Sequence, residues 1–410
     1  MSKPDIHSLR EYELYCDARL ANPYPLFHRL REEDPVHWSE RLSSWVITRY
    51  DDVYTGLRDE RLGNDRASVN MSALPEPQRT DLGPLGEHVS NWLGFTDPPK
   101  HTRMRSFVSK VVNPKLAIDM KDRIQAIVNE LLDRVQPKGH MDAINDFAFA
   151  LPATVICEVL GIDSDRQQEF KSWLDDITAF VGGVGPFLKK VAEQAYKSQQ
   201  QLTVFLRELT LKRRGEPRND MISMLAAVEG QSDGLTEQEL MGLCTFLFAA
   251  GEETTVSLIG NGIFLLLQHP EDMARLKNQP ELMKSAIEEF LRYESPIPIS
   301  PRLALADVEV RNRCIRKGDA VILMNGSANR DPAQFPDPDR LEIGRTNNKH
   351  LAFGWGDHFC LGGPLARMEG QIAIKSILER FPNLRLQEGQ KLHWRQNMSI
   401  RCLESLPVAF

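Results

Sequence analysis

The sequence predicts a mainly α-helical fold with a smaller β-rich region. Apolar residues recur at helical spacing over most of the chain from about residue 115 to Glu294, whereas β-prone runs are confined to two short regions. The chain has 410 residues, of which 41% are hydrophobic and 26% charged, a composition typical of globular proteins that bury a large core. This composition excludes disordered, collagen-like and coiled-coil proteins.

The first elements are short strands, and helices follow them. Residues 36–38 and 45–48 are β-prone runs separated by a polar stretch, which predicts a hairpin. Helical periodicity then predicts four amphipathic helices: residues 119–135, 142–160, 186–212 and 220–228.

A longer and more apolar helix comes next. Thr236 as N-cap and Glu239 three positions later form a capping box, which opens an apolar run to about Gln268. At 1.5 Å per residue, such a helix is on the order of 45 Å long. Because it is apolar on all sides, it must cross the middle of the molecule.

After Glu294 the chain becomes β-prone and then rich in turns. Residues 302–310 and 320–324 predict strands, and a final amphipathic helix begins after Pro364. The sequence has no internal repeat and no low-complexity linker, so composition marks no domain boundary. Length alone is compatible with roughly two or three domains.

Charge and cysteine usage point to a reducing, aqueous compartment. The 50 Lys and Arg against 57 Asp and Glu give a net charge of −7, without a basic run for nucleic acid. The six cysteines stand far apart, as in reduced cytosolic proteins. The N-terminus lacks a signal-peptide core, and no apolar stretch approaches the roughly 20 residues that span a bilayer. We therefore expect a cytoplasmic protein that binds neither membrane nor nucleic acid.

One cysteine, Cys360, lies in a glycine-rich loop within residues 350–367, directly before a helical pattern. A helix N-terminus favours thiolate over thiol, so Cys360 is either a nucleophile or a metal ligand. His358 could act as the base of a nucleophile, whereas His350, His358 and Cys360 supply at most three of about four zinc ligands. A buried structural role is the simplest interpretation for the other cysteines: Cys16, Cys157, Cys244, Cys314 and Cys402.

This loop resembles a known cofactor site. The haem-binding loop of the cytochrome P450 family is similar to it at six positions: Phe353, Gly354, Cys360, Gly362, Leu365 and Ala366. The resemblance implies haem b as the cofactor, with Cys360 as the axial thiolate ligand of the iron. It also implies the cytochrome P450 fold, in which the long central helix crosses the haem.

The central helix carries a second match. Glu252 and Glu253 are adjacent carboxylates in an apolar helix, where burial is costly, and a glycine in mid-helix costs about 1 kcal/mol relative to alanine. The segment resembles the oxygen-activating motif of the family. That resemblance assigns the proton relay to Glu253 and Thr254, and the O₂ groove to Ala250 and Gly251. Glu252 is expected on the helix surface or in a salt bridge.

Charged residues elsewhere match further haem supports of the family. Haem propionates are anions that need cationic partners. Four residues match the positions that contact them: His101, Arg105, Arg302 and His358. Glu289 and Arg292, three residues apart on one helix face, match an E-x-x-R pair that a third arginine joins from a turn-rich segment. Arg340 is expected to be that third member of a buried structural network.

The resemblance implies a monooxygenase that activates O₂ with two electrons and hydroxylates or epoxidises a medium-to-large hydrophobic molecule, such as a secondary metabolite. The sequence has no flavin or NAD fingerprint, so electrons are expected from a soluble ferredoxin or flavodoxin and its reductase, with NAD(P)H acting only indirectly. Basic residues near Cys360 are candidates for the docking face: Lys100, Arg103, Lys110 and Lys349. Two alternatives stay open, an H₂O₂-driven peroxygenase and a non-catalytic haem-thiolate sensor or carrier. The acid and alcohol at Glu253 and Thr254 speak against both.

Mostly apolar segments are expected, by their position in the family, to line the substrate pocket: residues 62–95, 181–185, Phe246, Ala250, 297–299 and 397–400. The lining indicates a hydrophobic substrate but does not identify it. Because the contacts assigned to one haem extend from His101 to Cys360, residues 1–410 are expected to form a single domain around one cofactor. The protein is expected to be a monomer.

Overall fold

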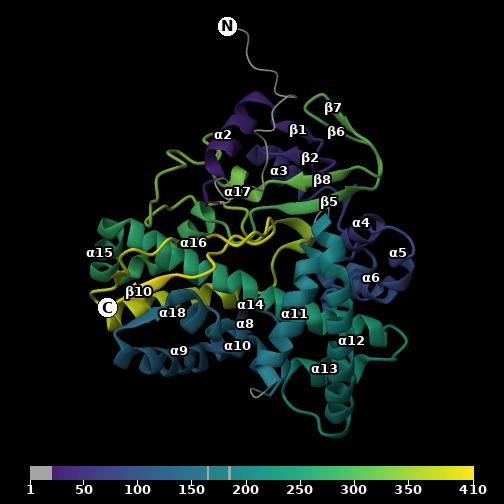
Figure 1. Ribbon diagram of the computed structural model, residues 1–410, viewed down its shortest axis with the longest axis horizontal. Coiled ribbons are helices and arrows are strands. Elements are labelled where there is room, and N and C mark those ends of the chain that lie inside the picture. The colour runs from purple at the N-terminus through teal and green to yellow at the C-terminus, as the bar shows by residue number, and fades with distance from the viewer. Residues whose placement is uncertain (1–20, 164–165, 183–185) are drawn as a thin grey trace.

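In the computed structural model, which describes residues 21–163, 166–182 and 186–410, helices pack around one long central helix and a small sheet lies on one side of it (Figure 1). The predicted class, mainly helical with a smaller β-rich region, is confirmed. Cys16 and residues 183–185 of the expected pocket lining lie outside the described residues.

The helices up to residue 160 are mostly short at the start and longer later. They are α2 (Tyr24–Glu33), α3 (Tyr50–Gly56), α4 (Arg66–Ser72), α5 (Gln78–Asp81), α6 (Gly83–Ser90), α7 (Lys100–Val108), α8 (Pro114–Asp119), α9 (Lys121–Val135), the π-helical turn η5 (Ala143–Ala148) and α10 (Ala150–Leu160). The later helices are α11 (Gln167–Val181), α12 (Pro186–Gly215), α13 (Met221–Val228), α14 (Glu237–Gln268), α15 (Pro270–Asn278), α16 (Met283–Tyr293), α17 (Asn325–Ala328) and α18 (Gly363–Arg380). Short 3₁₀ turns occur at η3 (Leu93–Phe95), η4 (Gln136–Lys138), η7 (Pro280–Leu282) and η8 (Gly356–His358).

The strands form three small sheets among the described residues. A five-stranded sheet has the order β1 (Val36–Ser39), β2 (Ser44–Ile47), β8 (Ala320–Leu323), β5 (Ser300–Ala304), β3 (Leu62–Gly63). The others join β4 (His140–Asp142), β10 (Pro407–Ala409) and β9 (Arg385–Leu386), and pair β6 (Val308–Val310) with β7 (Arg313–Ile315). The predicted N-terminal hairpin is confirmed, because β1 and β2 pair antiparallel with Val36 opposite Ile47.

Two predicted helices have different boundaries in the structure. The prediction of a helix over residues 142–160 is wrong at its start, because β4 ends at Asp142 and a π-helical turn precedes α10. The Asp142 carboxylate accepts hydrogen bonds from the Ile144 and Asn145 N–H groups and so caps that turn. Residues 119–135 are divided between the end of α8 and α9. The other two predicted helices correspond to α12 and α13.

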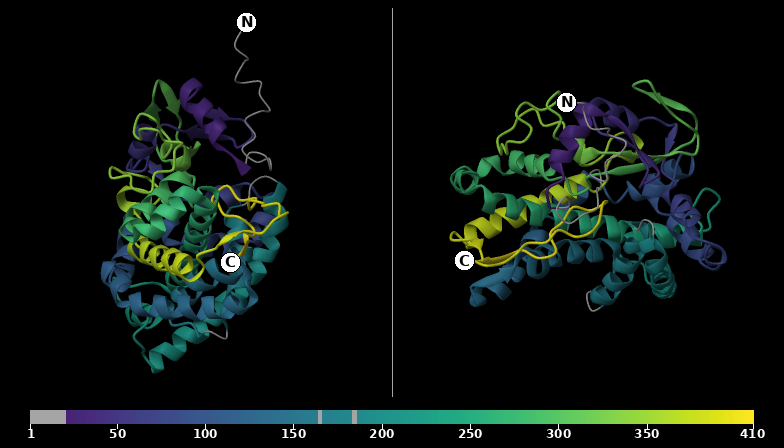
Figure 2. Two further views of the ribbon diagram at one scale, coloured as in Figure 1. Left: turned by 90° about the vertical axis from the view of Figure 1, so that its left-hand side faces the viewer. Right: turned by 45° about the horizontal axis from the view of Figure 1, so that its top comes forward.

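The central helix α14 has the predicted start and end. The Thr236 side chain accepts from the Glu239 N–H, and the Glu239 carboxylate accepts from the Thr236 N–H, which completes the capping box. The first half of α14 packs in one apolar cluster with α6 and α10 to α13, and its second half packs in another with α9, α16 and α18. The helix therefore joins both cores. Figure 1 shows the strands β1, β2, β5 and β8 above α14 and the helices α9 and α13 below it, and the left view of Figure 2 shows the same arrangement from the side.

Among the described helices, one stretch, Ala143–Leu160, is long and apolar enough to cross a membrane by composition alone. It comprises the π-helical turn and α10, and 67% of it is buried inside the protein. Since α10 packs against α14, its apolar character is accounted for by this core contact.

Candidate active site

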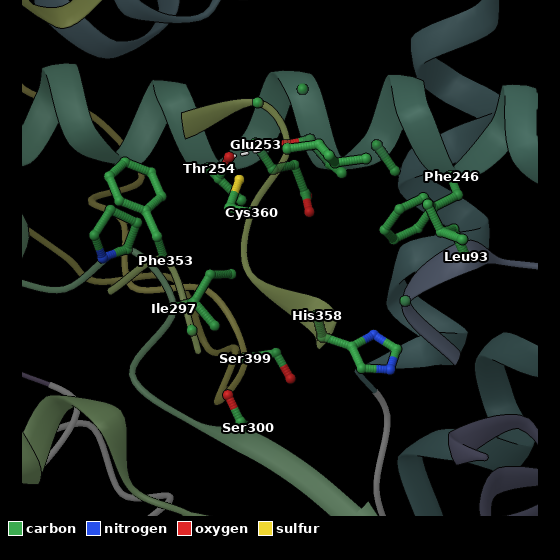
Figure 3. Close-up of a pocket in the computed structure, with 18 of the residues that line it drawn as sticks. Leu93, Phe246, Glu253, Thr254, Ile297, Ser300, Phe353, His358, Cys360 and Ser399 are labelled. Carbon is green, nitrogen blue, oxygen red and sulfur yellow. Dashed lines mark hydrogen bonds between the residues drawn. The ribbon is translucent and has the colours of Figure 1, made fainter. Parts of the chain in front are cut away.

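A cavity of about 400 Å³ lies beside the middle of α14, between that helix and the loop that carries Cys360 (Figure 3). Most of its wall is apolar, and the expected lining segments contribute to it at these positions: Asn64, Arg66, Trp92 to Phe95, Val181, Gly182, Phe246, Ala250, Ile297, Ile299, Asn397, Ser399 and Ile400. The sequence analysis missed further lining residues on α10, α11 and α14: Ile156, Val159, Thr178, Leu247 and Ala249.

The loop before Cys360 is folded by two left-handed glycines and short backbone bonds. Gly354 and Gly356 have φ angles of 68° and 72°, in the left-handed region that residues other than glycine rarely adopt. The Cys360 N–H donates to the Phe353 carbonyl over 3.0 Å, and the Gly354 N–H donates to Leu351 over 3.0 Å. These constraints place Cys360 on the cavity wall at the start of α18. Gly356 has the same need for glycine as Gly354, although only Gly354 was singled out from the sequence.

The Cys360 sulfur is surrounded by groups that favour a negative charge. Burial raises the pKa of this thiol, but the sulfur accepts hydrogen bonds from the backbone N–H groups of Gly362 and Gly363. The nearby guanidinium groups of Arg367 and Arg105 also lower the pKa. A buried sulfur with two amide donors suits a thiolate whose charge is balanced by a metal ion.

The two other roles considered for Cys360 lack the partners they need. The His358 Nε2 is 3.0 Å from the Asn64 amide nitrogen, and its ring stacks on His101 at 4.0 Å between centroids, so His358 is engaged away from the sulfur. The His350 Nε2 lies 3.0 Å from a Glu288 carboxylate oxygen. Within the described part of the chain, no group of three or more His, Cys, Asp or Glu residues is placed to hold a metal ion by itself.

On α14, Thr254 and Thr255 bond to the backbone one turn earlier. The Thr254 hydroxyl donates to the Ala250 carbonyl over 2.8 Å, and the Thr255 hydroxyl donates to Gly251 over 3.2 Å. Figure 3 shows Glu253 and Thr254 on the helix that crosses the view, with the Cys360 loop next to it. A Cβ atom on Gly251 would come within 2.9 Å of the Ile156 Cδ1, so this glycine allows α10 to approach α14 closely.

Glu253 lines the cavity, whereas Glu252 is buried beside it. Burial raises the pKa of both carboxyl groups, and the negative charge of Glu253 raises that of Glu252 further. The prediction that Glu252 lies on the helix surface or in a salt bridge is wrong, since it is only 5% exposed and forms no salt bridge with a described residue. Both carboxyl groups therefore hold a proton more readily than an exposed glutamate does.

Four basic side chains line the cavity around the Cys360 loop: His101, Arg105, Arg302 and His358. Arg302 is buried, which lowers its pKa to about 10 and still leaves it cationic at neutral pH. The His101 Nε2 is buried and has no hydrogen-bond partner among the described residues. A buried nitrogen without a partner calls for a hydrogen-bonding ligand, and the nearby Arg105 guanidinium favours one that carries negative charge. Together with the sulfur of Cys360, these residues fit a haem with its propionates at this side.

The buried ion pair of Glu289 and Arg292 on α16 is joined by Arg345, not by the predicted Arg340. Glu289 and Arg292 are fully buried and joined by two hydrogen bonds of 2.8 Å. The third partner is Arg345, whose Nε donates to both Glu289 oxygens over 3.2 and 3.3 Å. The prediction that Arg340 fills this place is wrong. The Arg340 side chain is exposed to solvent, and only its backbone carbonyl accepts a hydrogen bond from Arg292.

Two of the four expected docking residues form contacts with other parts of the chain. Arg103 donates to the Gly234 carbonyl and forms an ion pair of 2.5 Å with Glu239, and the Lys100 Nζ donates to Asn91 over 2.7 Å. Lys110 and Lys349 are exposed. The exposed basic surface near Cys360 is therefore narrower than expected.

Glu369 on α18 is a cavity residue that the sequence analysis missed. It is 2% exposed, and its Oε2 has no hydrogen-bond partner among the described residues. Burial raises its pKa to about 8, so the carboxyl group is mostly neutral at neutral pH. The available signal was its position on the apolar stripe of the last helix, four residues after Leu365 and four before Ala373.

Comparisons with known proteins agree with this geometry. The family model described as Cytochrome P450 matches residues 84–400. Polyketide biosynthesis cytochrome P450 PksS of Bacillus subtilis is 36% identical over 396 residues, covering 95% of this chain and 96% of that protein. The 6-deoxyerythronolide B hydroxylase of Saccharopolyspora erythraea is 36% identical over 404 residues, covering 97% and 98%. The crystal structure of P450BioI in complex with hexadec-9Z-enoic acid ligated acyl carrier protein matches with a TM-score of 0.88 at 36% identity, covering 96% and 99%.

Proposed function

Because this chain belongs to the cytochrome P450 family of monooxygenases, we propose that it oxidises a medium-to-large hydrophobic molecule with O₂ and two electrons from a separate redox protein. In the balanced reaction, a substrate C–H bond, O₂, two electrons and two protons give an alcohol and water; epoxidation of a C=C bond has the same requirement. The observation that carries this proposal is the shared cavity of the Cys360 sulfur and the acid–alcohol pair of Glu253 and Thr254.

The proposed cofactor is haem b. Cys360 would supply the thiolate that ligates the iron, and the basic side chains of His101, Arg105, Arg302 and His358 would hold the propionates. When bound, the haem supplies the reduction of O₂ and the transfer of one oxygen atom to the substrate. Phe353 and Gly354 shape the loop, and Gly362 donates its N–H group to the sulfur, which moderates its charge.

The chain itself would deliver the two protons. The raised pKa of Glu253 keeps a proton available at the cavity wall, and the Thr254 hydroxyl stands one residue further along α14. The Thr254 hydroxyl donates a hydrogen bond to the Ala250 carbonyl. A hydroxyl can donate to one group while accepting from another, so Thr254 can pass a proton from Glu253 or water toward the reacting oxygen.

The electrons are proposed to come from a soluble ferredoxin or flavodoxin and its reductase, so that NAD(P)H acts only through these partners. The exposed residues Lys110 and Lys349 would attract an acidic redox protein. The substrate is proposed to be a secondary metabolite, a class that fits the apolar cavity and the printed names of the polyketide-related relatives. We further propose that residues 1–410 form one domain and act as a cytoplasmic monomer.

A reconstitution experiment tests this function against the alternatives. Holoprotein, a surrogate ferredoxin, its reductase and NADPH should oxidise a library hit selected by its effect on the haem spectrum. Oxidation with H₂O₂ but not with the electron-transfer chain would favour a peroxygenase instead. Ligand binding without turnover in either system would favour the sensor or carrier. Glu253 and Thr254 favour the monooxygenase, since neither alternative needs an acid–alcohol pair.

A further inference from the structure

From the placement of one charged side chain in the cavity, we infer that Arg66, together with Ser399, binds the anionic head group of an amphipathic substrate whose apolar chain extends toward Cys360. This inference rests on the proposed function, because it assigns the substrate class of the same cavity. The substrate class is an acid with a long apolar chain, oxidised on that chain and away from its charge.

Arg66 is the basic cavity residue that the cofactor does not account for. Among the described residues that line the cavity, the other basic side chains are the four around the Cys360 loop: His101, Arg105, Arg302 and His358. Arg66 instead begins α4, which the Asp65 side chain caps by accepting from the Ser68 N–H over 3.0 Å. Its position is therefore set by a different element from those that surround the cofactor.

The Arg66 guanidinium group packs over an aromatic side chain. Its central carbon lies 4.7 Å from the centroid of the Phe95 ring. A guanidinium group carries five N–H donors at its edges. One Arg66 N–H group is 3.4 Å from the Ser399 Oγ, which also lines the cavity.

Ser399 is held by its own loop near the C-terminus. Its N–H donates to the Asn397 Oδ1 over 2.8 Å, and the Ile400 N–H donates to the same oxygen over 3.2 Å. Figure 3 shows Ser399 beside Ser300, on the side of the cavity away from Glu253 and Thr254. Arginine and serine donors from two separate elements thus meet at one end of the cavity, a pairing suited to carboxylate or phosphate oxygens.

The rest of the cavity fits this polarity. Among the described residues that line it, the acidic side chains are Glu253 and Glu369, which lie on the helices that flank Cys360 rather than on α4. Apolar side chains make up much of the remaining wall, among them Leu93, Phe246, Ile297 and Ile299. A ligand with a negative head and an apolar chain therefore meets a complementary surface along its length.

The test compares ligands of equal chain length on the haem-loaded protein. Dodecanoate, dodecyl phosphate and dodecan-1-ol are titrated separately, and binding is followed by calorimetry and by the spectral change of the haem. Wild-type protein should bind at least one of the anions more tightly than the alcohol. Arg66→Gln should weaken that anion by about 10- to 100-fold, as expected for loss of a charge-assisted hydrogen bond, and change the alcohol little. Arg66→Lys should lie between the two. The anion with the larger response identifies the head group as carboxylate or phosphate.

Arg61→Gln is the matched control, because Arg61 lies five residues earlier, is exposed and pairs with Asp59 outside the cavity. It should leave all three affinities unchanged. Equal affinity of wild type for the anions and the alcohol would overturn the inference, and so would an equal loss for all ligands in Arg66→Gln. In each protein the reduced, CO-bound spectrum reports the thiolate ligand independently. If that signature is present while the anions lose their preference, only the inference fails; if it is absent from wild type, the proposed function fails.

Discussion

Thr254 is the residue whose hydroxyl the proposed proton delivery depends on. Removing it in Thr254→Ala leaves the haem supports untouched but interrupts proton transfer to the reacting oxygen. We expect the variant to bind haem normally, to form product at least about tenfold more slowly, and to release a larger share of its reducing equivalents as H₂O₂. The measurement is the ratio of H₂O₂ to product for each NADPH consumed.

Ser257→Ala provides the control for this substitution. The Ser257 hydroxyl donates to the Glu253 carbonyl over 2.9 Å, so it has the same kind of backbone bond on the same helix as Thr254. Unlike Thr254, it is not among the residues that line the cavity. It should retain wild-type coupling. Tightly coupled turnover in Thr254→Ala would contradict the proposed relay.

Glu369 should make the stability of the protein depend on pH. Its pKa is about 8 in the folded chain, against an ordinary value of 4.5, because burial disfavours the charged form. Below pH 4.5 both states hold the proton, so the burial cost is absent. As the pH rises from about 4.5 to about 8, the unfolded chain ionises first and folding loses a few kcal/mol. Glu369→Gln should lack this loss.

Urea unfolding of the haem-loaded proteins at about pH 5 and about pH 9 measures the difference. The wild-type free energy of unfolding should fall more between the two conditions than that of Glu369→Gln. Glu252 and Glu253 also have raised pKa values, but they are present in both proteins and cancel from the comparison. Identical pH dependence in the two proteins would show that Glu369 is not held neutral.

At the residue scale, local chemistry was predictable where the backbone itself demands a residue type. Glycines around Cys360 indicated a tight loop because glycine adopts the left-handed angles of Gly354 and Gly356 without steric cost. The arginine of the α16 network was not predictable in this way. Arg340 and Arg345 have the same chemistry, and the path of the turn between them decides which one reaches Glu289.

The helix crossings of α14 depend on glycines. A Cβ atom on Gly260 would overlap the Ile144 Cδ1, so Gly260→Ala forces α14 away from the π-helical turn. Alanine gains about 1 kcal/mol in helix propensity, but overpacking costs typically 1–3 kcal/mol, so we expect a net loss of stability. Adding Ile144→Val, which removes the overlapping methyl, should recover part of it. Thermal unfolding of the single and double variants measures both effects.

Gly215→Ala is the comparison for this element, because no atom lies within 4 Å of the added methyl at the end of α12. It should be neutral or slightly stabilising. If Gly260→Ala were equally harmless, the close approach of α14 to the π-helical turn would not be a determinant of the fold.

The stability of the contact between α16 and the loop after α17 should depend on the Arg345 side chain rather than on that of Arg340. Arg345→Ala leaves the fully buried Glu289 with only one of its two cations, which should cost on the order of 3 kcal/mol. Arg340→Ala removes an exposed side chain and should change the free energy of unfolding by less than about 0.5 kcal/mol. Urea unfolding compares the two variants, and the reverse order would contradict the assignment.

Elements with strong local signals were predicted most closely. The capping box at Thr236 predicted the start of α14 and the apolar helical pattern predicted its end. Both signals come from residues close together in the sequence. The start of the helix predicted over residues 142–160 failed for a long-range reason. His140–Asp142 (β4) pairs with Pro407–Ala409 (β10). Because this partner strand is more than 260 residues away, the sequence around residue 142 does not indicate the pairing.

For the whole molecule, the central feature is that distant segments close around one cavity. Its walls combine residues from Leu57 near the start to Ile400 near the end, with α14 crossing between them. Periodicity alone could not predict this closure, because it depends on contacts between distant parts of the chain. The family resemblance predicted it through motifs that surround one cofactor.

The most direct test of this account is the absorption spectrum of the reduced, CO-bound holoprotein. We predict the red-shifted Soret band of a thiolate-ligated haem in wild type and in the control variant Cys314→Ser, because Cys314 is exposed and lies outside the cavity. Cys360→His should bind haem but lose the red shift. An unshifted band in wild type, or a red-shifted band that persists in Cys360→His, would contradict the assignment of Cys360 as the iron ligand.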